Sequence, residues 1–380
     1  MVGAAERASL LNGARGAEIS HFLNAVGWGG ADVRPLAGDA STRRYLRVRS
    51  GDRDAVLMDA PPRAESAACP PDADEAARRA LGYNALARLA GPDLVAFVAV
   101  ADHLRALGLS APEVHEADAE HGLAIIEDLG DALFGPTLGA GAGDEAAFYG
   151  AAVDALVHLH DAPAPEIMPA RGAERRLLSY DHVAMATETE LLLDWFFPFV
   201  AGREAGADER AEFAALWSPL FDAARGEDVL VLRDYHADNL IWLPERDGPA
   251  RAGLLDFQDA VSGSPAYDLA SLLDDIRRDV DRDVAEALLT KYCAASAARP
   301  GFDEEAFRAA YAALAAQRNA KILGIFVRLE KRDGKARYLD YLPRVWTRFT
   351  DELRHPALAN LKRWTDDHLA AGYDRFGGSP

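Results

Sequence analysis

The segment LRDYHADNLIW, residues 232–242, restricts what this chain can fold into more than any other stretch of it. It places two aspartates, a histidine and an asparagine between the apolar runs 229–232 and 240–243, which have the length and composition of short buried strands. A turn that only reverses the chain is commonly marked by Gly, Asn-Gly or Asp-Gly, and this loop has no glycine. It is also longer and more charged than reversal requires. Its composition therefore fits a catalytic or metal-binding loop as well as a hydrogen-bonded polar turn.

A further aspartate follows this loop after another strand and turn. Asp256 lies at the end of the expected strand in AGLLDFQDA, residues 252–260, so the polar residues occur in the order Asp234, Asn239, Asp256. Protein-kinase-like phosphotransferases have this order: the first aspartate accepts the proton of the attacking hydroxyl, and the asparagine and second aspartate hold Mg²⁺ against the nucleotide phosphates. Carboxylate and amide oxygens are ligands that Mg²⁺ prefers. Each acid alone would fit a surface turn, but the order of all three favours a Mg²⁺-dependent phosphotransferase.

The rest of the chain divides into a strand-rich and a helix-rich part. Paired strands are expected within residues 33–60 around the turn SGDRD, and two more in PEVHEAD and GLAIIEDLG. Helical composition is found in the ranges 75–90, 93–107, 144–160, 174–195, 207–224, 265–277, 281–297, 303–332 and 350–371. This arrangement predicts an α+β fold with two lobes. We expect a small, strand-rich, nucleotide-binding N-lobe of residues 1–130 and a larger, mostly helical C-lobe of residues 131–380.

Composition argues against several kinds of partner. Of the 380 residues, 49% are apolar and 27% charged, and no apolar run approaches the roughly 20 residues that span a bilayer. A formal net charge of −20, without a dense Lys/Arg block, argues against nucleic acid or an anionic membrane surface as a partner. The start of the chain lacks the pattern of a secretory signal, and Cys69 and Cys293 are the only cysteines. We therefore expect a reducing, cytoplasmic location, and a monomer.

The motifs around these residues resemble a known enzyme family. LRDYHADNLIW and LLDFQDAVSGSPAYDLASLLDD are similar to the aminoglycoside phosphotransferase/choline kinase superfamily, in which a histidine, here His236, follows the catalytic aspartate. A closer resemblance, to the bacterial anomeric sugar kinases that act on N-acetylmuramate and N-acetylglucosamine, covers most of the chain. It rests on LAGDASTRRYLRV, VLMDAPP, GLAIIEDLGD, DFQDAVSGSPAYDLASLLDDIRRDV and QRNAKILGIFVRL.

The resemblance implies a bilobal protein-kinase-like fold and a definite reaction. ATP, with Mg²⁺, would phosphorylate the C1 hydroxyl of these sugars to the α-1-phosphates used in peptidoglycan recycling. The segment IIEDLGD would be the hinge, where backbone groups of Glu127 and Leu129 contact adenine. Asp268, at the start of an expected helix, is assigned the structural role of bracing the catalytic loop. The candidates for contact with the sugar are His236, Gln258, Asp259, Arg277 and Arg318.

One residue of ordinary kinases is missing from the N-lobe. Kinases use a lysine on the third strand to reach the α/β-phosphates, but the corresponding segment, AVLMDAP, has none, and Lys291 is the first lysine of the chain. The nearest cations are Arg43 and Arg44, and an arginine can hold a phosphate with two hydrogen bonds. Adjacent strand residues face opposite sides, so one of the two faces the nucleotide, and we expect Arg43 because it lies closer to the turn GDAST. The expected phosphate loop consists of Gly38, Asp39, Ser41 and Thr42 of that turn.

Two other functions remain open at this point. The same machinery could phosphorylate another alcohol, such as choline, an amino alcohol or an aminoglycoside. The chain could instead be a nucleotide-binding regulatory pseudokinase, which the missing lysine favours, whereas the intact set of Asp234, Asn239 and Asp256 argues against it. Release of ADP from Mg-ATP with a panel of acceptors would separate these functions.

Overall fold

The structure is a computed structural model that describes residues 11–36, 43–62, 68–225 and 228–378. Within these residues, the N-terminal part is an antiparallel five-stranded sheet in the order β1-β2-β3-β5-β4. Its strands are β1 Asp32–Pro35, β2 Arg44–Ser50, β3 Arg53–Asp59, β4 Val114–Asp118 and β5 Leu123–Ile126. Ser50 pairs with Arg53 across the turn, which confirms the expected hairpin at SGDRD.

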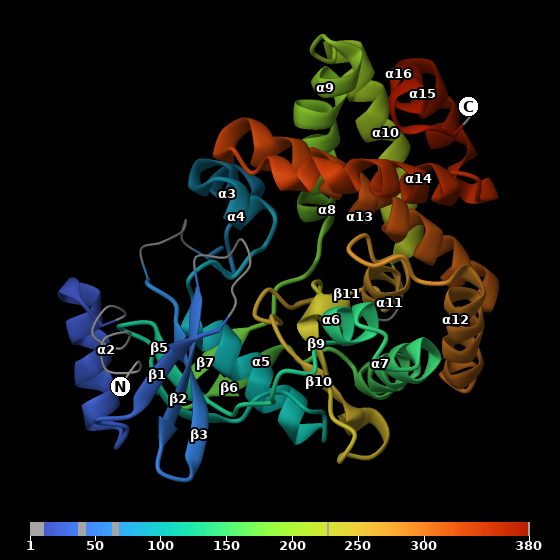
Figure 1. Ribbon diagram of the computed structural model, residues 1–380. Coiled ribbons are helices and arrows are strands. Elements are labelled where there is room, and N and C mark those ends of the chain that lie inside the picture. Colours follow the sequence, from blue (N-terminus) through green and yellow to red (C-terminus); the bar gives the residue numbers. More distant parts are fainter. Residues whose placement is uncertain (1–10, 37–42, 63–67, 226–227, 379–380) are drawn as a thin grey trace.

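Alternating side chains of the sheet cover two different cores. Leu57 on β3 packs with Ile19 of α2 (Gly13–Ala25), and both side chains are fully buried. Met58, the next residue, faces the opposite side and joins the main core beneath α5 (Leu94–Ala106). Figure 1 shows α2 and α5 on either side of the sheet. The sheet is therefore a two-sided layer, which explains the apolar run in β3.

The remaining elements are mostly helices. The helices are α6 Phe134–Gly139, α7 Glu145–His160, α8 His182–Leu191, α9 Phe197–Ala201, α10 Ala207–Ala224, α11 Ala266–Leu273, α12 Arg282–Ser296, α13 Glu304–Asp333, α14 Leu342–Glu352, α15 Ala359–His368 and α16 Ala370–Phe376. The short strands are β6 Ile167–Ala170, β7 Ala173–Arg176, β8 Val229–Val231, β9 Leu240–Trp242, β10 Ala252–Leu254 and β11 Val261–Gly263. A π-helical stretch occupies Leu192–Phe196, and 3₁₀ turns occupy Ala237–Asn239, Gly248–Arg251, Ala336–Tyr341 and Pro356–Leu358.

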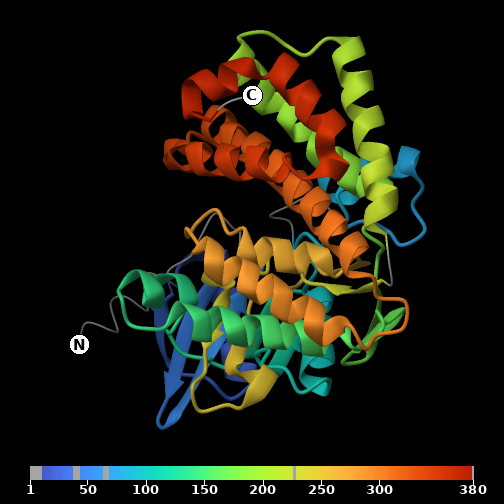
Figure 2. The same cartoon turned by 90° about the vertical axis from the view of Figure 1, so that its right-hand side faces the viewer.

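The longest helix links two bodies of the molecule. The 30-residue α13 packs against α8, α10, α11 and α14. Figures 1 and 2 show an upper body of helices α8–α10 and α13–α16, above a lower body that holds the five-stranded sheet, α5–α7, α12 and the short strands β8–β11. The α+β class expected from the sequence, a strand-rich N-terminal part followed by a mostly helical remainder, is confirmed, whereas the boundary near residue 130 stays a prediction. Among the described residues, no helix has the length and apolarity needed to cross a bilayer.

Several expected helix boundaries were wrong, each for a local reason. The range 174–195 begins instead with the hairpin β6–β7, which turns at Gly172 with φ +92°, and α8 begins after Asp181, whose carboxylate accepts the Ala184 N–H at 2.9 Å. The range 75–90 is broken at Gly82, whose φ of +94° is unfavourable for other residues. Pro356 interrupts the range 350–371. Strand β11 was not predicted at all.

The segment between β3 and α5 leaves the sheet and packs on the upper body. We define residues 68–93 as the strap; it contains α3 Glu75–Leu81 and α4 Tyr83–Leu86. The buried Arg78 pairs with Asp181 at the start of α8, at 2.6 Å, and Ala85 shares an apolar cluster with Leu178. Figure 1 places α3 and α4 beside α8, away from the sheet. A part of the chain that precedes residue 130 is therefore built into the helical body.

Candidate active site

The loop after β8 is held in a strained conformation by a buried carboxylate. Arg233 has a left-handed backbone, with φ +69°, although it is not glycine and is 2% exposed. Asp268, fully buried in the first turn of α11, accepts the backbone N–H groups of Leu232 at 2.6 Å and of Arg233 at 2.8 Å. Such strained residues persist where their surroundings hold them, and they cluster at functional sites. Asp268 therefore braces the loop and fixes the position of Asp234.

The same loop fixes the orientation of the Asn239 side chain. Its Nδ2 group donates to the backbone carbonyl of Asp234 at 3.0 Å and lies 3.3 Å from His236 Nε2. Because the Nδ2 group faces these two acceptors, the Oδ1 atom of the same amide points away from them. Oδ1 is a neutral oxygen ligand of the kind that Mg²⁺ accepts. The role of Asn239 as a metal ligand, which its spacing suggested, stays a prediction.

Asp256 lies next to Asn239 because two short strands pair. Leu254 of β10 pairs with Leu240 of β9, and the Leu255 N–H donates to the Asn239 carbonyl at 3.0 Å. Asp256 itself has a left-handed backbone, with φ +56°, and its Oδ1 accepts Gln258 Nε2 at 2.9 Å. Burial, and next the negative charge of Asp234, raise the pKa of Asp256 above its ordinary value. The two carboxylates are therefore close enough to repel each other, and a cation between them would relieve this repulsion.

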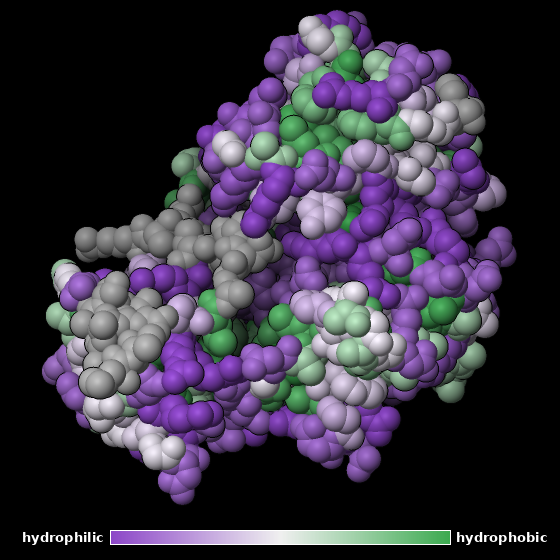
Figure 3. All heavy atoms as spheres, viewed as in Figure 1, coloured by the Kyte–Doolittle hydropathy of each residue, from purple (hydrophilic) through white to green (hydrophobic). Residues whose placement is uncertain are grey.

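Arg43 and Arg44 point in opposite directions, as the alternation of strand residues required. Arg43 Nη1 lies 3.7 Å from Asp256 Oδ1, and its Nη2 donates to the Gly91 carbonyl at 2.6 Å. Arg44 Nε instead donates at 2.9 Å to the fully buried Asp59, which Arg15 of α2 also holds. Arg43 is thus the cation of this pair beside the candidate metal site. Figure 3 shows hydrophilic side chains gathered between the upper and lower bodies on this side of the molecule.

A comparison with known proteins agrees with this geometry. The sequence model of the phosphotransferase enzyme family, APH, matches residues 32–309. The chain belongs to this family. It is 48% identical to the N-acetylmuramate/N-acetylglucosamine kinase of Caulobacter vibrioides over 94% of this chain and 98% of the relative. It is 32% identical to the protein of the same name from Pseudomonas aeruginosa, over 90% of this chain and 91% of that relative.

Solved structures show that the fold of this phosphotransferase is that of the protein-kinase-like enzymes. A choline/ethanolamine kinase family protein from Mesorhizobium loti matches with a TM-score of 0.54 and 17% identity, over 94% of this chain and 99% of that chain. The choline kinase of Streptococcus pneumoniae matches with a TM-score of 0.52 and 14% identity, over 90% of this chain and 98% of that chain.

The expected hinge of this phosphotransferase directly follows β5. The Glu127 N–H donates to the Glu113 carbonyl at 2.8 Å, and the Glu127 carboxylate pairs with Arg246 at 2.7 Å. Leu129 is 9% exposed and packs with Ile241 of β9. Their contact with adenine stays a prediction. The expected phosphate loop, Gly38, Asp39, Ser41 and Thr42, lies outside the described residues.

The residues expected on the acceptor side have different surroundings. His236 is buried, and Arg277 Nη1 donates to its Nε2 at 2.7 Å. Gln258 is committed to Asp256, and Asp259 accepts the backbone N–H of Ala90 in the strap at 2.6 Å. Arg318 is buried on α13. Asp259 therefore holds the strap, while contact of any of these residues with the sugar stays a prediction.

A buried charge cluster behind the catalytic loop was missed by sequence reasoning. Arg233 Nη2 donates to Glu188 of α8, and Lys321 of α13 lies 2.9 Å from the same carboxylate. Burial alone would raise the pKa of Glu188, but Lys321 and Arg233 together lower it to about 2. Arg233 Nη1 also donates to the Ala87 carbonyl of the strap at 2.9 Å. No motif or spacing marks Glu188, and its proximity to Arg233 arises only from the packing of α8.

Proposed function

We propose that the chain transfers the γ-phosphoryl group of ATP to the C1 hydroxyl of N-acetylmuramate and N-acetylglucosamine, forming the α-1-phosphates. The observation that carries this proposal is the 48% identity, over nearly the whole length of both chains, to a kinase named for these two sugars. The arrangement of Asp234, Asn239 and Asp256 supports the phosphotransfer itself. The choice of the C1 hydroxyl, and a place in peptidoglycan recycling, rest on the resemblance described above.

In this proposal Asp234 orients the acceptor hydroxyl and accepts its proton. Asp234 is half-buried in a loop whose neighbours Arg233 and Tyr235 are buried, so its carboxylate is held by the loop while remaining within reach of an acceptor. Asp268 and the charge cluster behind the loop keep this carboxylate in one place. Accurate placement is what makes a general base effective, because the acceptor oxygen must lie at hydrogen-bond distance from it.

The site fits a magnesium ion bound together with nucleotide phosphates. Asn239 would offer its Oδ1 atom and Asp256 its carboxylate, and both are hard oxygen ligands. Among the described residues, no three His, Cys, Asp or Glu side chains form a metal site of their own, and in this proposal the nucleotide phosphates would complete the coordination. Bound Mg²⁺ would neutralise phosphate charge and fix the orientation of the transferred group.

The nucleotide would lie between the sheet and the catalytic loop. Backbone groups of Glu127 and Leu129 would contact adenine, and Arg43 would take over the phosphate contact of the missing lysine. Arg43 already faces Asp256, so a phosphate held by the metal at Asp256 would also be near its guanidinium. The turn that contains Gly38 and Thr42 would cover the phosphates. The same proposal includes a cytoplasmic monomer without nucleic-acid or membrane partners.

The test is to incubate the pure protein with Mg-ATP and a panel of acceptors that includes both N-acetylated sugars, choline, ethanolamine and an aminoglycoside. We expect ADP release only with the N-acetylated sugars, and an acid-labile anomeric phosphate in the ³¹P NMR spectrum. Release with choline or an aminoglycoside alone would replace the proposed acceptor. Nucleotide binding without turnover on any acceptor would favour the pseudokinase function.

A further inference from the structure

Arg318 is a deeply buried cation on α13, the helix that packs on α11. It is 5% exposed, and its Nη1 atom has no hydrogen-bond partner among the residues that the structure describes. Its charge acts on two carboxylates, Asp268 and Asp274. Asp268 is committed to the two backbone N–H groups of the catalytic loop. Asp274 Oδ2 accepts Asn319 Nδ2 at 2.5 Å, and its Oδ1 is in ion pairs with Arg348 at 3.5 Å and Arg282 at 3.7 Å. A buried cation whose neighbouring carboxylates are engaged elsewhere is unfavourable unless a ligand supplies the anion.

A second buried donor without a partner lies within reach of this charge. His236 is 3% exposed, and its Nε2 atom receives Arg277 Nη1 at 2.7 Å and faces Asn239 Nδ2 at 3.3 Å. Both of these groups are donors, so Nε2 is the acceptor and the ring proton is on Nδ1. In the described part of the chain, Nδ1 has no hydrogen-bond partner.

These two donors belong to the surroundings of the catalytic loop. His236 follows the proposed base Asp234 by two residues, and Asp268, which experiences the charge of Arg318, holds the two N–H groups just before Asp234. The proposed contacts with metal and phosphate are made by other groups, namely Asn239 Oδ1, Asp256 and Arg43. Arg318 Nη1 and His236 Nδ1 are therefore available to bind the acceptor sugar.

We propose that Arg318 and the Nδ1–H group of His236 bind the carboxylate of an acidic amino sugar, so that they distinguish N-acetylmuramate from N-acetylglucosamine. This inference rests on the proposed function. N-acetylmuramate carries a lactyl carboxylate that N-acetylglucosamine lacks. A carboxylate offers two acceptor oxygens to the two donors, and its charge neutralises the buried guanidinium.

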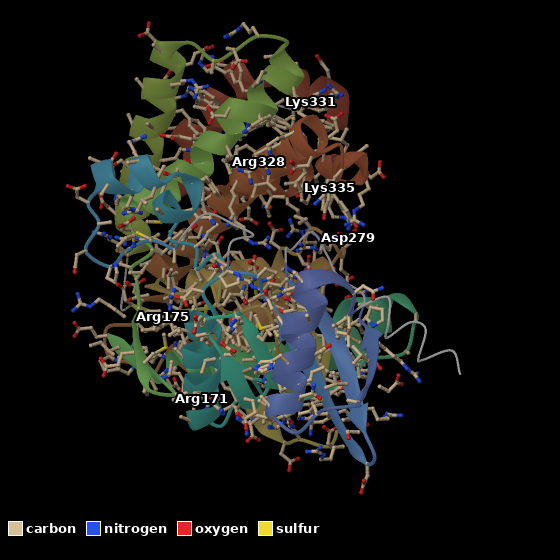
Figure 4. All side chains as sticks on the ribbon, turned by 90° about the vertical axis from the view of Figure 1, so that its left-hand side faces the viewer. Arg171, Arg175, Asp279, Arg328, Lys331 and Lys335 are labelled. Atoms are coloured by element: carbon tan, nitrogen blue, oxygen red, sulfur yellow. The ribbon has the colours of Figure 1, made fainter. Side chains whose placement is uncertain are left out.

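Further cations lie along the same helix. Figure 4 shows Arg328 and Lys331 on the last turns of α13 and Lys335 just after the helix, with Asp279 below them. The Nε atom of Arg328 is buried and has no hydrogen-bond partner within the described residues. In a chain with a net charge of −20, this local group of cations would attract an anionic acceptor and not a neutral one. We therefore expect added salt to lower kcat/KM for N-acetylmuramate more than for N-acetylglucosamine.

The decisive experiment is steady-state kinetics of Arg318→Met with both sugars at saturating Mg-ATP. We expect kcat/KM for N-acetylmuramate to fall about 10- to 100-fold, the scale of a lost charge-assisted hydrogen bond. The value for N-acetylglucosamine should change less than about 3-fold, because this sugar has no group for the site. Arg318→Lys should recover part of the loss, since it keeps the charge without the planar fork. The matched control is Arg332→Met on the same helix, where Arg332 is 58% exposed and pairs with Asp333.

The outcomes separate this inference from the proposed function. Equal losses with both sugars in Arg318→Met and Arg318→Lys, or no loss with either, would overturn the carboxylate site while the sugar kinase activity of the wild type stands. Should Arg318→Met fail to fold, the ratio of the two sugars in Arg318→Lys decides alone. If the wild type phosphorylates neither sugar, calorimetric titration with both sugars decides, because equal affinities would overturn the inference as well.

Discussion

The negative charge of Asp234 raises the pKa of Asp256, yet the two carboxylates have different proposed roles, Asp234 as general base and Asp256 as metal ligand. Asp256 is in contact with Gln258 and Arg43, which suits a metal ligand next to phosphate. Asp234 is placed by the backbone of its own loop. Because the tasks differ, substitutions at the two positions should have different kinetic signatures.

Asp234→Asn should leave Mg-ATP binding nearly intact and lower kcat by about 100-fold or more, the usual scale of lost general-base assistance. The amide keeps the shape of the side chain but cannot accept the proton. Nucleotide affinity from calorimetry and kcat from an ADP-release assay check this expectation. A variant with near wild-type turnover would remove Asp234 from the role of base.

Arg43→Ala should raise KM for ATP and lower kcat together, with kcat/KM reduced roughly 10- to 100-fold. Arg44→Ala is the matched control, because Arg44 pairs with Asp59 on the other face of the sheet, and Arg15 continues to hold that carboxylate. An ATP titration of both variants is the measurement. Two silent variants would mean that Mg²⁺ and backbone amides hold the phosphates without an arginine of this strand.

Residues near one another in sequence could be placed before the structure was known. The spacing of Asp234 and Asn239 within one loop predicted their proximity, and strand alternation predicted that Arg43 and Arg44 diverge. Glu188 could not be found in this way, because it lies 45 residues from Arg233 and meets it only through helix packing. The unsatisfied donors of His236 and Arg318 were also beyond reach, since a missing partner leaves no trace in a sequence.

At the scale of elements, α7 and α12 are joined by a buried histidine. His160, 4% exposed at the end of α7, has its Nδ1 atom 2.8 Å from the hydroxyl of Tyr292 on α12. Burial, and next the charge of Arg299, lower the pKa of His160 from 6.5 to about 3. The folded protein therefore keeps this ring neutral at pH values where the unfolded chain protonates it.

The free energy of unfolding should consequently fall as the pH drops below 6.5 and continue to fall toward pH 3. The unfolded state binds one more proton in this range, so His160 contributes a slope of up to about 1.4 kcal/mol per pH unit. His160→Gln should remove this part of the slope in urea denaturation series between pH 7 and 5. The exposed His158 on the same helix gives the control, His158→Gln, and an unchanged slope in both variants would contradict the assignment.

The boundaries of several helices could not be predicted from the helix propensity of their residues. The ranges 75–90 and 174–195 have helical composition, yet Gly82 separates α3 from α4, and Gly172 turns the hairpin whose second strand occupies the start of the range 174–195; both glycines have positive φ. Both glycines are visible in the sequence, but their conformation depends on packing against the rest of the chain. The strands within 229–257 were correctly expected, because short apolar runs on both sides of a polar loop favour strands.

At the scale of the whole molecule, the strap links the chain before the expected hinge to the helical body. Arg78 and Arg88 both pair with Asp181, at 2.6 Å and 3.1 Å. Asp181→Ala should lower the free energy of unfolding by roughly 2–3 kcal/mol, through a lost helix cap and two lost ion pairs. Hydrogen exchange of residues 75–91 should also accelerate.

Asp303→Ala is the matched control for this variant. Asp303 caps α13 by accepting the Ala306 N–H at 2.8 Å, the same type of cap that Asp181 gives α8. Equal stability losses and equal exchange of residues 75–91 in the two variants would mean that the arginines of the strap contribute nothing beyond the cap.

The strap also decides what could be exchanged between relatives of this protein. Consider a chimera that joins the N-terminal lobe of one relative to the C-terminal lobe of another at the expected hinge. The strap would come from the first protein, whereas its partners Asp181, Arg233 and Asp259 would come from the second. A graft that keeps the strap with its own helical body needs two further junctions, near Pro62 and near Pro92, where the chain leaves and rejoins the sheet lobe. The N-terminal lobe therefore cannot be exchanged as one continuous segment, because the strap within it packs on the helical body.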